Sequence, residues 1–437
     1  MIAGQLSQML LGLADTMMIG RVGTVELAAV AFVNSLFFLG FALASGLFAA
    51  VSVRVSHAFG SARPESISGS LRHGLLLSLL FGLFLSLAYL GLSFRLDWFR
   101  QPPEVTELSG SYFRWLALSY LPMVPMLTLK SFSEALNKPW PVLWLMLGTV
   151  VLNVWLNYLL IFGNAGLPAM GLDGAGCATF LARCAGFVAV FVYICKSPQM
   201  RPRLPARWCA PIDWSVVRYL VKLGLPISLQ VSLEFAVFAA CSLLMGQFGS
   251  TTLAAHQIAF TCSSTAFMLP LGLSMALTIR VGHAVGAQQW VSCRRMILGA
   301  LLMITGAMSL TGAVFVGFGS ELAASFTLDQ DVVRMTAAFL VVVAIYQGFD
   351  GVQVISMSAL RGMHDVYVPT WINFGNFFLF AVPLGIVLAF FVGLGGIGLW
   401  YGVATGMCVS AIVLTTRLRL ILRRQSAPTP NSEPVKI

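Results

Sequence analysis

Charged residues divide this chain into long apolar runs, and the length of those runs constrains its fold more than any other feature. Of its 437 residues, 58% are hydrophobic and 10% are charged, and the mean hydropathy is +0.87. A soluble domain cannot bury so much apolar surface, whereas a membrane-spanning helix needs about 20 apolar residues. The runs lack the alternation of apolar and polar residues that membrane β-barrel strands show. The sequence therefore predicts an all-α integral membrane protein.

The apolar runs predict twelve transmembrane helices in two lobes of six. Their predicted spans are 1–20, 25–53, 71–94, 108–134, 139–162, 173–195, 215–245, 252–279, 293–318, 332–360, 368–392 and 396–420. We expect an N-lobe over 1–197 and a C-lobe over 198–424, with a cytoplasmic linker at about 196–214. The polar tail, 425–437, has the composition of a disordered segment.

Basic residues set the predicted orientation in the membrane. Most of the 26 Lys and Arg lie in turns after even-numbered helices or at the C-terminus. By the positive-inside rule both termini are then cytoplasmic, in a multi-pass protein of the cell's inner membrane. This topology largely explains the net charge of +10. A nucleic-acid partner would require basic residues interleaved with aromatics on one surface, and the sequence shows no such pattern.

The eight cysteines are scattered along the chain, mostly within the predicted helices. No C-x-x-C pair and no His/Cys cluster has the spacing of metal ligands. We therefore expect neither disulfides, nor a structural metal, nor a cofactor.

The chain contains an internal duplication. Residues 27–60 and 253–286 align without gaps, and RVSHAFG in the first segment matches RVGHAVG in the second. Because six helices return the chain to its starting side, the two halves are parallel repeats, as in several secondary transporters. When the two halves are aligned, the beginning of helix seven has no counterpart in helix one. We therefore expect the sequence to start part-way along helix one.

Three carboxylates fall well inside apolar runs, namely Asp15, Glu234 and Asp350. An ionised carboxylate at the centre of a helix costs about 2.5–3.5 kcal/mol, so such residues usually face a cavity, carry a proton or hold an ion. A structural hydrogen bond, or an ion pair with Arg183, is the alternative for any one of them. Three together favour a site that loads and releases a cation.

Other polar side chains are predicted to line a cavity. Asn153 and Asn157 are four residues apart and share a helix face, as do Tyr346 and Asp350. Gln257 lies near the start of helix eight, where it could face either a cavity or a partner helix. Hydrogen bonding between helices remains the alternative for the two asparagines.

Three motifs resemble the multidrug and toxic-compound extrusion (MATE) family, and the NorM-like branch in particular. They are DTMMIGRVG (15–23), AAHQIAFTCSSTAFMLPLGLSMALTIRVGHAVG (254–286) and YQGFDGVQVISMSALRGMHD (346–365). The resemblance covers nearly the whole chain. It implies two six-helix lobes around a central cavity that opens alternately to each side of the membrane. It also implies export of cationic, amphipathic drugs in exchange for Na⁺ or H⁺.

The resemblance also implies roles for individual residues. Glu234, Tyr346 and Asp350 fall on the cation site of the C-lobe, and Gln257 falls on a polar position of the cavity. The residues that correspond to the N-lobe site are Asp15, Asn153, Asn157 and Thr179. Asn157 stands where the DinF-like branch has a second carboxylate, and no proline precedes Pro64 to kink the first helix.

Two other functions are compatible with parts of the sequence. A lipid-linked oligosaccharide flippase of the same superfamily would need basic residues in its cavity, whereas the clearest cavity candidates here are acidic. A membrane enzyme would need converging catalytic groups, and we find no nucleophile, metal or Walker motif, so we expect a transporter that is not an enzyme. We expect it to act as a monomer in the lipid bilayer.

Overall fold

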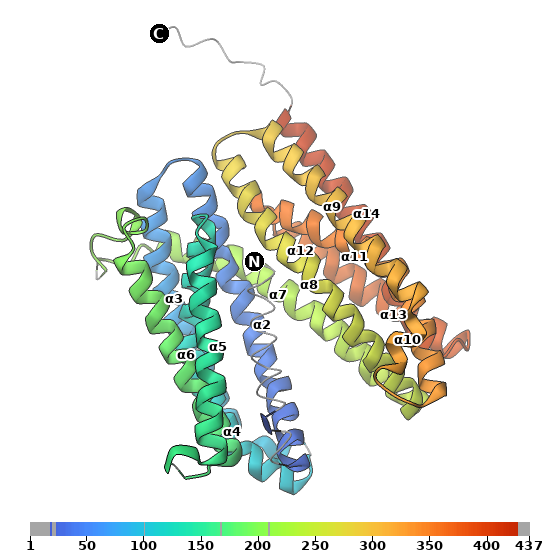
Figure 1. Cartoon of the computed structure of the whole chain (residues 1–437). Helices are drawn as coiled ribbons and strands as arrows, with labels where there is room; N and C mark the ends of the chain where they lie inside the picture. Colours follow the sequence, from blue (N-terminus) through green and yellow to red (C-terminus); the bar gives the residue numbers. More distant parts are fainter. Residues whose placement is uncertain (1–17, 20–22, 100, 167, 209, 427–437) are drawn as a thin grey trace. The chain divides into compact units, whose positions relative to one another are not determined.

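The computed structural model describes residues 18–19, 23–99, 101–166, 168–208 and 210–426, most of which are helical and none of which forms a β-strand. The chain divides into two compact units, Met1–Leu233 and Glu234–Ile437. In Figure 1 the helices of the first unit run from blue to green, and those of the second from yellow-green to red.

Long helices make up both units. The first unit contains α2 (Thr24–Gly60), α3 (Pro64–Ser93), α4 (Pro103–Ala135), α5 (Pro139–Phe162), α6 (Gly171–Lys196) and the first part of α7 (Trp214–Met245). The second contains the rest of α7, α8 (Ser250–Gly286), α9 (Trp290–Gly317), α10 (Gly319–Ala324), α11 (Gln330–Gly362), α12 (Tyr367–Phe374), α13 (Val382–Ile386) and α14 (Gly396–Ser426). Two π-helical segments, Gly375–Ala381 and Val387–Phe391, flank α13 and join it to α12 as one span.

Ten helical segments in the described part of the chain are long and apolar enough to cross a membrane. Large apolar side chains such as Phe84, Trp144 and Leu302 are more than half exposed on their outer surfaces. In water such a surface would be unfavourable, but a bilayer supplies apolar surroundings. The all-α membrane fold predicted from the sequence is therefore confirmed.

Helix lengths support the internal duplication. α2 and α8 are both 37 residues long, and α4 and α11 are both 33 residues long. The turns after α2 and α8 also match, since Ala62 and Gln288 adopt similar positive φ angles of 53° and 56°. The compact units nevertheless divide within α7, at Leu233 and Glu234. The lobe boundary at 197/198, which follows from counting helices in the repeat, stays a prediction.

Several helices are longer than their predicted spans. α2 continues to Gly60 rather than residue 53, α8 continues to Gly286 rather than 279, and α3 begins at Pro64 rather than 71. The prediction ended helices where charged residues began, because charge marks the edge of the apolar layer. The backbone hydrogen bonds of a helix do not depend on that edge, so the helices project beyond it.

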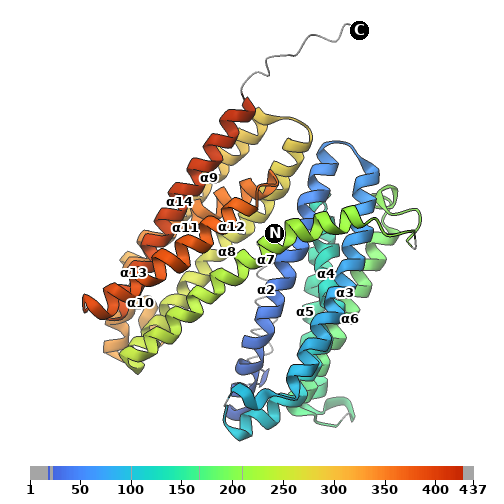
Figure 2. The same ribbon diagram turned by 180° about the vertical axis from the view of Figure 1, so that it is seen from behind.

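The first part of α7 packs tightly against α2 (Figure 2). A Cβ atom added to Gly46 of α2 would overlap the Ser228 backbone of α7, and one added to Gly224 of α7 would overlap the carbonyl of Leu47. The Ser228 hydroxyl donates to the Leu43 carbonyl at 2.6 Å. Small residues thus let two backbones approach closely, as is common for helices in membranes.

The linker before α7 is hydrogen-bonded to α3. The buried His73 donates from Nδ1 to the Gly69 carbonyl at 2.8 Å, which leaves Nε2 to accept from the Asp213 N–H at 2.9 Å. Arg72 donates to the Pro211 carbonyl at 2.7 Å. One helix therefore fixes two backbone groups of the linker.

Asp213 also forms the N-cap of α7. Its Oδ1 accepts from the Ser215 hydroxyl at 2.6 Å and from the Ser215 N–H at 2.9 Å, and these bonds lower the pKa of the Asp213 carboxyl. Because the folded-state pKa is lowered, this stabilisation is present at neutral pH and is lost as the pH falls through that pKa.

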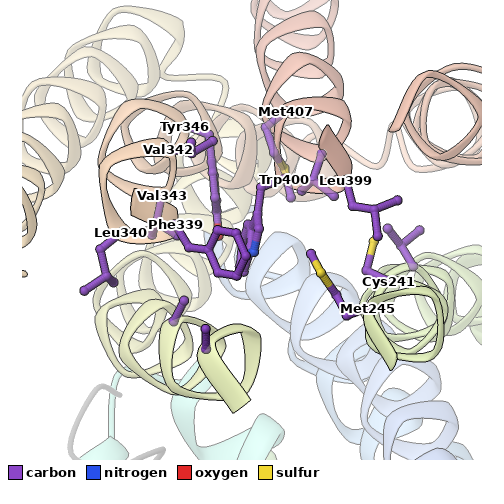
Figure 3. Close-up of a cluster of buried hydrophobic side chains, with 14 of the residues drawn as sticks. Cys241, Met245, Phe339, Leu340, Val342, Val343, Tyr346, Leu399, Trp400 and Met407 are labelled. Carbon is purple, nitrogen blue, oxygen red and sulfur yellow. The ribbon is translucent and has the colours of Figure 1, made fainter. Parts of the chain in front are cut away.

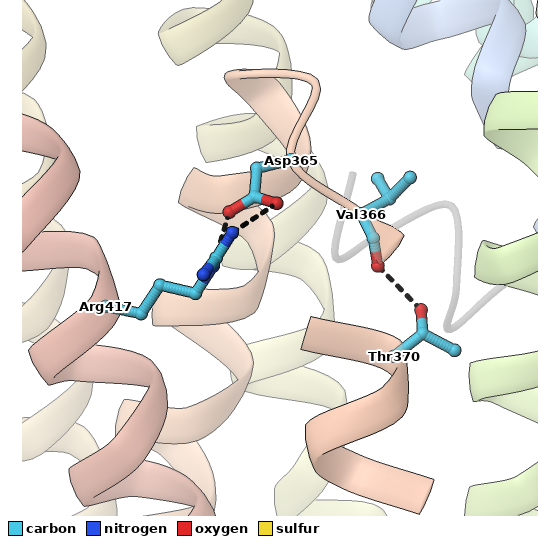
Figure 4. Close-up of polar contacts among 4 residues, drawn as sticks. All are labelled: Asp365, Val366, Thr370 and Arg417. Atoms are coloured by element: carbon cyan, nitrogen blue, oxygen red, sulfur yellow. Dashed lines mark hydrogen bonds and ion pairs between the residues drawn. The ribbon is translucent and has the colours of Figure 1, made fainter. Parts of the chain in front are cut away.

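In the second unit, an ion pair joins the α11–α12 turn to α14 (Figure 4). Arg417 donates from two nitrogens to the two Asp365 oxygens, at 2.6 and 3.0 Å. This bidentate geometry fixes the turn more firmly than a single contact would. Thr370 donates to the Val366 carbonyl at 2.8 Å and so closes the first turn of α12.

The contact between α2 and α7 predicts a stability effect. Replacing Gly46 with Leu should destabilise the purified protein by about 1–3 kcal/mol, because the new side chain has to push the α7 backbone away. Thermal unfolding followed by intrinsic fluorescence measures the change. Gly148→Leu on α5, where an added Cβ meets open space, is the matched control. Equal losses in both variants would contradict the assigned contact.

The docking of the linker predicts its protease sensitivity. His73→Phe keeps an aromatic ring but removes the acceptor for the Asp213 N–H, so the linker should open more often. If the lost bond is worth about 1.4 kcal/mol, trypsin should cut after the exposed Arg207 about tenfold faster. Ser68→Ala, on the exposed face of α3, should leave the cleavage rate unchanged. Cleavage of His73→Phe at the wild-type rate would show that the bond does not hold the linker.

Candidate functional site

Two of the residues assigned to the cation site lie on one face of α11. Tyr346 and Asp350 are one helical turn apart, and both are buried, with exposed fractions of 1% and 9%. The Tyr346 hydroxyl lies 2.7 Å from the hydroxyl of Ser263 on α8. Within the described residues, no hydrogen bond reaches the Asp350 carboxylate. The buried Asp350 carboxylate thus lies one helical turn from Tyr346, whose hydroxyl is hydrogen-bonded to Ser263.

Glu234 completes the acidic pair in the second unit. It lies on α7, is partly buried, and interacts electrostatically with Asp350. It also interacts electrostatically with Arg361, near the end of α11. Two like charges in apolar surroundings repel each other, so a cation bound near them would relieve the repulsion. The pair is therefore suited to binding a positive charge reversibly.

Tyr346 belongs to a cluster of buried apolar and aromatic side chains (Figure 3). Trp400 of α14 stacks on Tyr346, with ring centroids 6.0 Å apart, and lies 6.1 Å from Phe339. Cys241 and Met245 of α7 belong to the same buried cluster. This packing holds α7, α11 and α14 together around the polar residues.

Near this cluster, His256 of α8 is the buried residue, and its neighbour Gln257 is not. The Gln257 side chain is exposed, whereas His256 is 1% exposed and its Nε2 lies 2.9 Å from the Ser242 hydroxyl. The His256 ring also lies 5.3 Å from Trp400. His256 and Ser263 were not predicted as site residues from the sequence, although their spacing of seven residues puts them on one face of α8. Gln257 stays a prediction for a cavity position.

The polar residues of the first unit also come together. Asn153 of α5 donates to the Thr179 hydroxyl of α6 at 3.3 Å, and Asn157 donates to the side-chain oxygen Oδ1 of Asn153 at 3.2 Å. All three side chains are buried. The expected shared face of Asn153 and Asn157 is therefore present. Asp15, the fourth residue assigned to this site, lies outside the described residues.

Arg183 of α6 is a partly buried basic residue of the first unit. Its guanidinium lies 4.7 Å above the Phe37 ring and donates to the Ser119 hydroxyl. A cation over an aromatic face is stabilised by the ring's negative face. Phe37 in turn stacks on Tyr120 at 4.5 Å. These contacts give the Arg183 charge favourable partners within its own unit.

The side chains available as ligands limit which ions Glu234 and Asp350 can hold. Within the ranges that the structure describes, no group of three or more His, Cys, Asp or Glu side chains is placed to hold a metal ion. A transition-metal site is therefore not indicated. An alkali cation at Glu234 and Asp350 would need hydroxyl, amide or carbonyl oxygens as further ligands.

Comparison with known proteins agrees with this architecture. The MatE family profile matches residues 1–159 and 226–387. A "Probable multidrug resistance protein NorM" of Bradyrhizobium diazoefficiens is 36% identical over 433 residues, 97% of this chain and 92% of the relative. A protein of the same name from Rhodopseudomonas palustris is 36% identical over 426 residues, 96% of this chain and 89% of the relative.

Solved structures share the fold at lower sequence identity. The Vibrio cholerae MATE transporter VcmN in its bent form is 23% identical, with a TM-score of 0.87 and coverage of 97% of this chain and 95% of that one. An outward-facing multidrug resistance MATE family transporter of the MOP superfamily is 20% identical, with a TM-score of 0.89 and coverage of 98% and 94%. The chain described here is therefore a member of the MATE family of membrane transporters, in its NorM-like branch.

Proposed function

We propose that this protein is a secondary active antiporter that exports cationic, amphipathic compounds from the cell in exchange for Na⁺ or H⁺. The observation that carries the proposal is the buried Asp350 carboxylate, which interacts electrostatically with Glu234. A charged pair in apolar surroundings is costly unless it binds a cation. The names of the NorM relatives support a multidrug substrate range.

The coupling follows from competition for one negative site. A cation from outside binds at Glu234 and Asp350 and thereby releases a cationic drug from the same protein. When the protein opens inward, the cation leaves and a drug can bind again. Each ligand shifts the population toward the conformation that binds it better, and this differential affinity links the two fluxes. The membrane potential contributes about 2.3 kcal/mol per charge per 100 mV.

The first unit contributes a site of a different character. Asn153, Asn157 and Thr179 form a neutral hydrogen-bonded group, in which the amides can reorient toward a ligand. We assign this group to contacts with the transported compound, and Gln257 of the second unit to the same role. Asp15 is assigned, like Glu234, Tyr346 and Asp350, to cation coupling. Neutral amides suit hydrogen bonding to varied polar groups on otherwise apolar molecules.

The same proposal fixes the cellular setting. The multi-pass protein would lie in the inner membrane, with both termini in the cytoplasm and the drug leaving toward the outside. No organic cofactor and no chemical reaction are needed, because the ion gradient supplies the free energy. A monomer suffices, since both halves of the repeat are present in one chain.

Ethidium efflux from loaded proteoliposomes tests the proposal. An inward Na⁺ gradient and an inward H⁺ gradient are imposed separately on the wild type, and one of them should drive efflux. Glu234→Gln and Asp350→Asn should each reduce that efflux to the rate of protein-free vesicles, because the site loses a negative charge. Asp331→Asn, at the exposed start of α11, should retain wild-type efflux.

Two outcomes would contradict the proposal. Normal gradient-driven efflux in the Glu234→Gln, Asp350→Asn double variant would show that these carboxylates do not couple ion and drug. Absence of efflux under either gradient, with correctly inserted wild-type protein, would favour a flippase acting on lipid-linked oligosaccharides. Transport of such a lipid would then be measured directly in the same vesicles.

A further inference from the structure

A positive charge lies in the middle of a membrane-spanning helix of the first unit. Arg183 is midway along α6, about 18–20 Å from either end of the helix at 1.5 Å per residue. An ionised side chain at that depth in a bilayer is costly, and such residues usually have a function. The proposed cation coupling at Glu234 and Asp350 does not use this arginine.

Arg183 faces the interior of the first unit and not the lipid. The exposed side chains in this part of α6 form one stripe, which consists of Leu181, Ala185, Val188 and Val192. Arg183 is two residues beyond Leu181, about half a turn, so it lies on the opposite face of the helix. It is only partly buried. The accessible part of its side chain is therefore on the inner side of α6.

Residues of α2 and α4 hold the guanidinium in place. It lies 4.7 Å above the Phe37 ring and donates to the Ser119 hydroxyl. Both partners are themselves fixed, since Ser119 donates to the Leu116 carbonyl at 2.7 Å and Tyr120 donates to the Phe37 carbonyl at 2.6 Å. Phe37 and Ser119 are neutral, so neither cancels the charge of Arg183. These contacts orient a positive charge before any ligand arrives.

Neutral hydrogen-bonding side chains continue from Arg183 along the same face. Thr179 lies one turn before it on α6 and accepts from Asn153 of α5 at 3.3 Å. A planar guanidinium binds a carboxylate through two parallel hydrogen bonds, and it repels another cation. The interior of the first unit therefore suits an anionic group on a ligand that is otherwise apolar.

We propose that Arg183 binds the carboxylate of transported compounds, so that the protein exports zwitterions, which carry a cationic group and a carboxylate on one molecule. The inference rests on the proposed export function and specifies its substrates. A phospholipid phosphate is the other abundant anion in a membrane, but headgroups lie at the surface, far from the middle of α6. Arg183 is thus a residue that determines specificity, because a compound with only a cationic group gains nothing from it.

Two rhodamine dyes that differ by one methyl ester test this assignment. Rhodamine 110 has a free carboxylate, and rhodamine 123 is its methyl ester. Fluorescence anisotropy measures the binding of each dye to the purified protein. Arg183→Gln should weaken rhodamine 110 binding by at least about tenfold, because a charged hydrogen-bonded pair is lost, and should leave rhodamine 123 within about twofold of the wild type.

Two further variants serve as controls. Arg183→Lys keeps the charge but loses the planar pair of donors, so rhodamine 110 should bind more tightly than in Arg183→Gln and more weakly than in the wild type. Arg114→Gln removes an exposed arginine of α4 in the same unit and should change neither affinity. Retained rhodamine 123 binding shows that each variant is folded.

Several outcomes would overturn the assignment. Equal losses of both dyes in Arg183→Gln would show that Arg183 only supports the structure. If Arg183 is only the counterion of Asp15, the Asp15→Asn, Arg183→Gln double variant will bind both dyes like the wild type. If the wild type exports rhodamine 123 from proteoliposomes but neither binds nor exports rhodamine 110, this inference fails and the antiport function stands. If neither dye is exported under either gradient, the export function fails, and the role of Arg183 fails with it.

Discussion

The absence of water in the hydrocarbon core of a bilayer is the constraint on which this structure depends. Every backbone N–H and C=O in that layer has to find a partner within the protein, and a helix satisfies them segment by segment. The chain responds with long helices whose outer side chains are apolar and exposed. The helices hydrogen-bond their own backbone groups, but polar side chains buried among them also need partners.

The buried polar side chains of the two units differ in their chemistry. In the first unit, Asn153, Asn157 and Thr179 bond to one another and remain neutral. In the second unit, Asp350 is buried without a hydrogen bond from the described residues, and Glu234 adds a second negative charge nearby. Neutral amides and hydroxyls can satisfy one another, whereas two buried carboxylates repel each other. Arg361 offsets part of the Glu234 charge, and a bound cation would offset more of the charge of the pair. The proposed division between substrate contacts and ion coupling follows from this difference.

Local departures from regular structure accompany the polar groups. α12 passes into a π-helical segment at Gly375, where Asn376 donates to the Gly406 carbonyl and to the Ser410 hydroxyl at 2.6 and 2.7 Å. π-helical turns are rare and often lie at functional positions. Gly46 of α2 and Gly224 of α7 allow the backbones of these two helices to approach closely, because neither has a side chain. The first π-helical segment thus coincides with a buried asparagine, and the close contact between α2 and α7 with two glycines.

The sequence by itself determined the features that depend on neighbours along one helix. Apolar run length gave the membrane helices, the repeat gave their matching lengths, and four-residue spacing put Tyr346 beside Asp350 and Asn153 beside Asn157. Charge could not define the helix ends, because helices continue past the apolar layer. Contacts between helices were decided only by the tertiary structure. The bond from Ser263 to Tyr346, the burial of His256 instead of Gln257, and the contact of Arg183 with Phe37 all depend on how each helix is rotated about its axis. That rotation is set by the packing of residues far apart in the chain, which no local pattern contains.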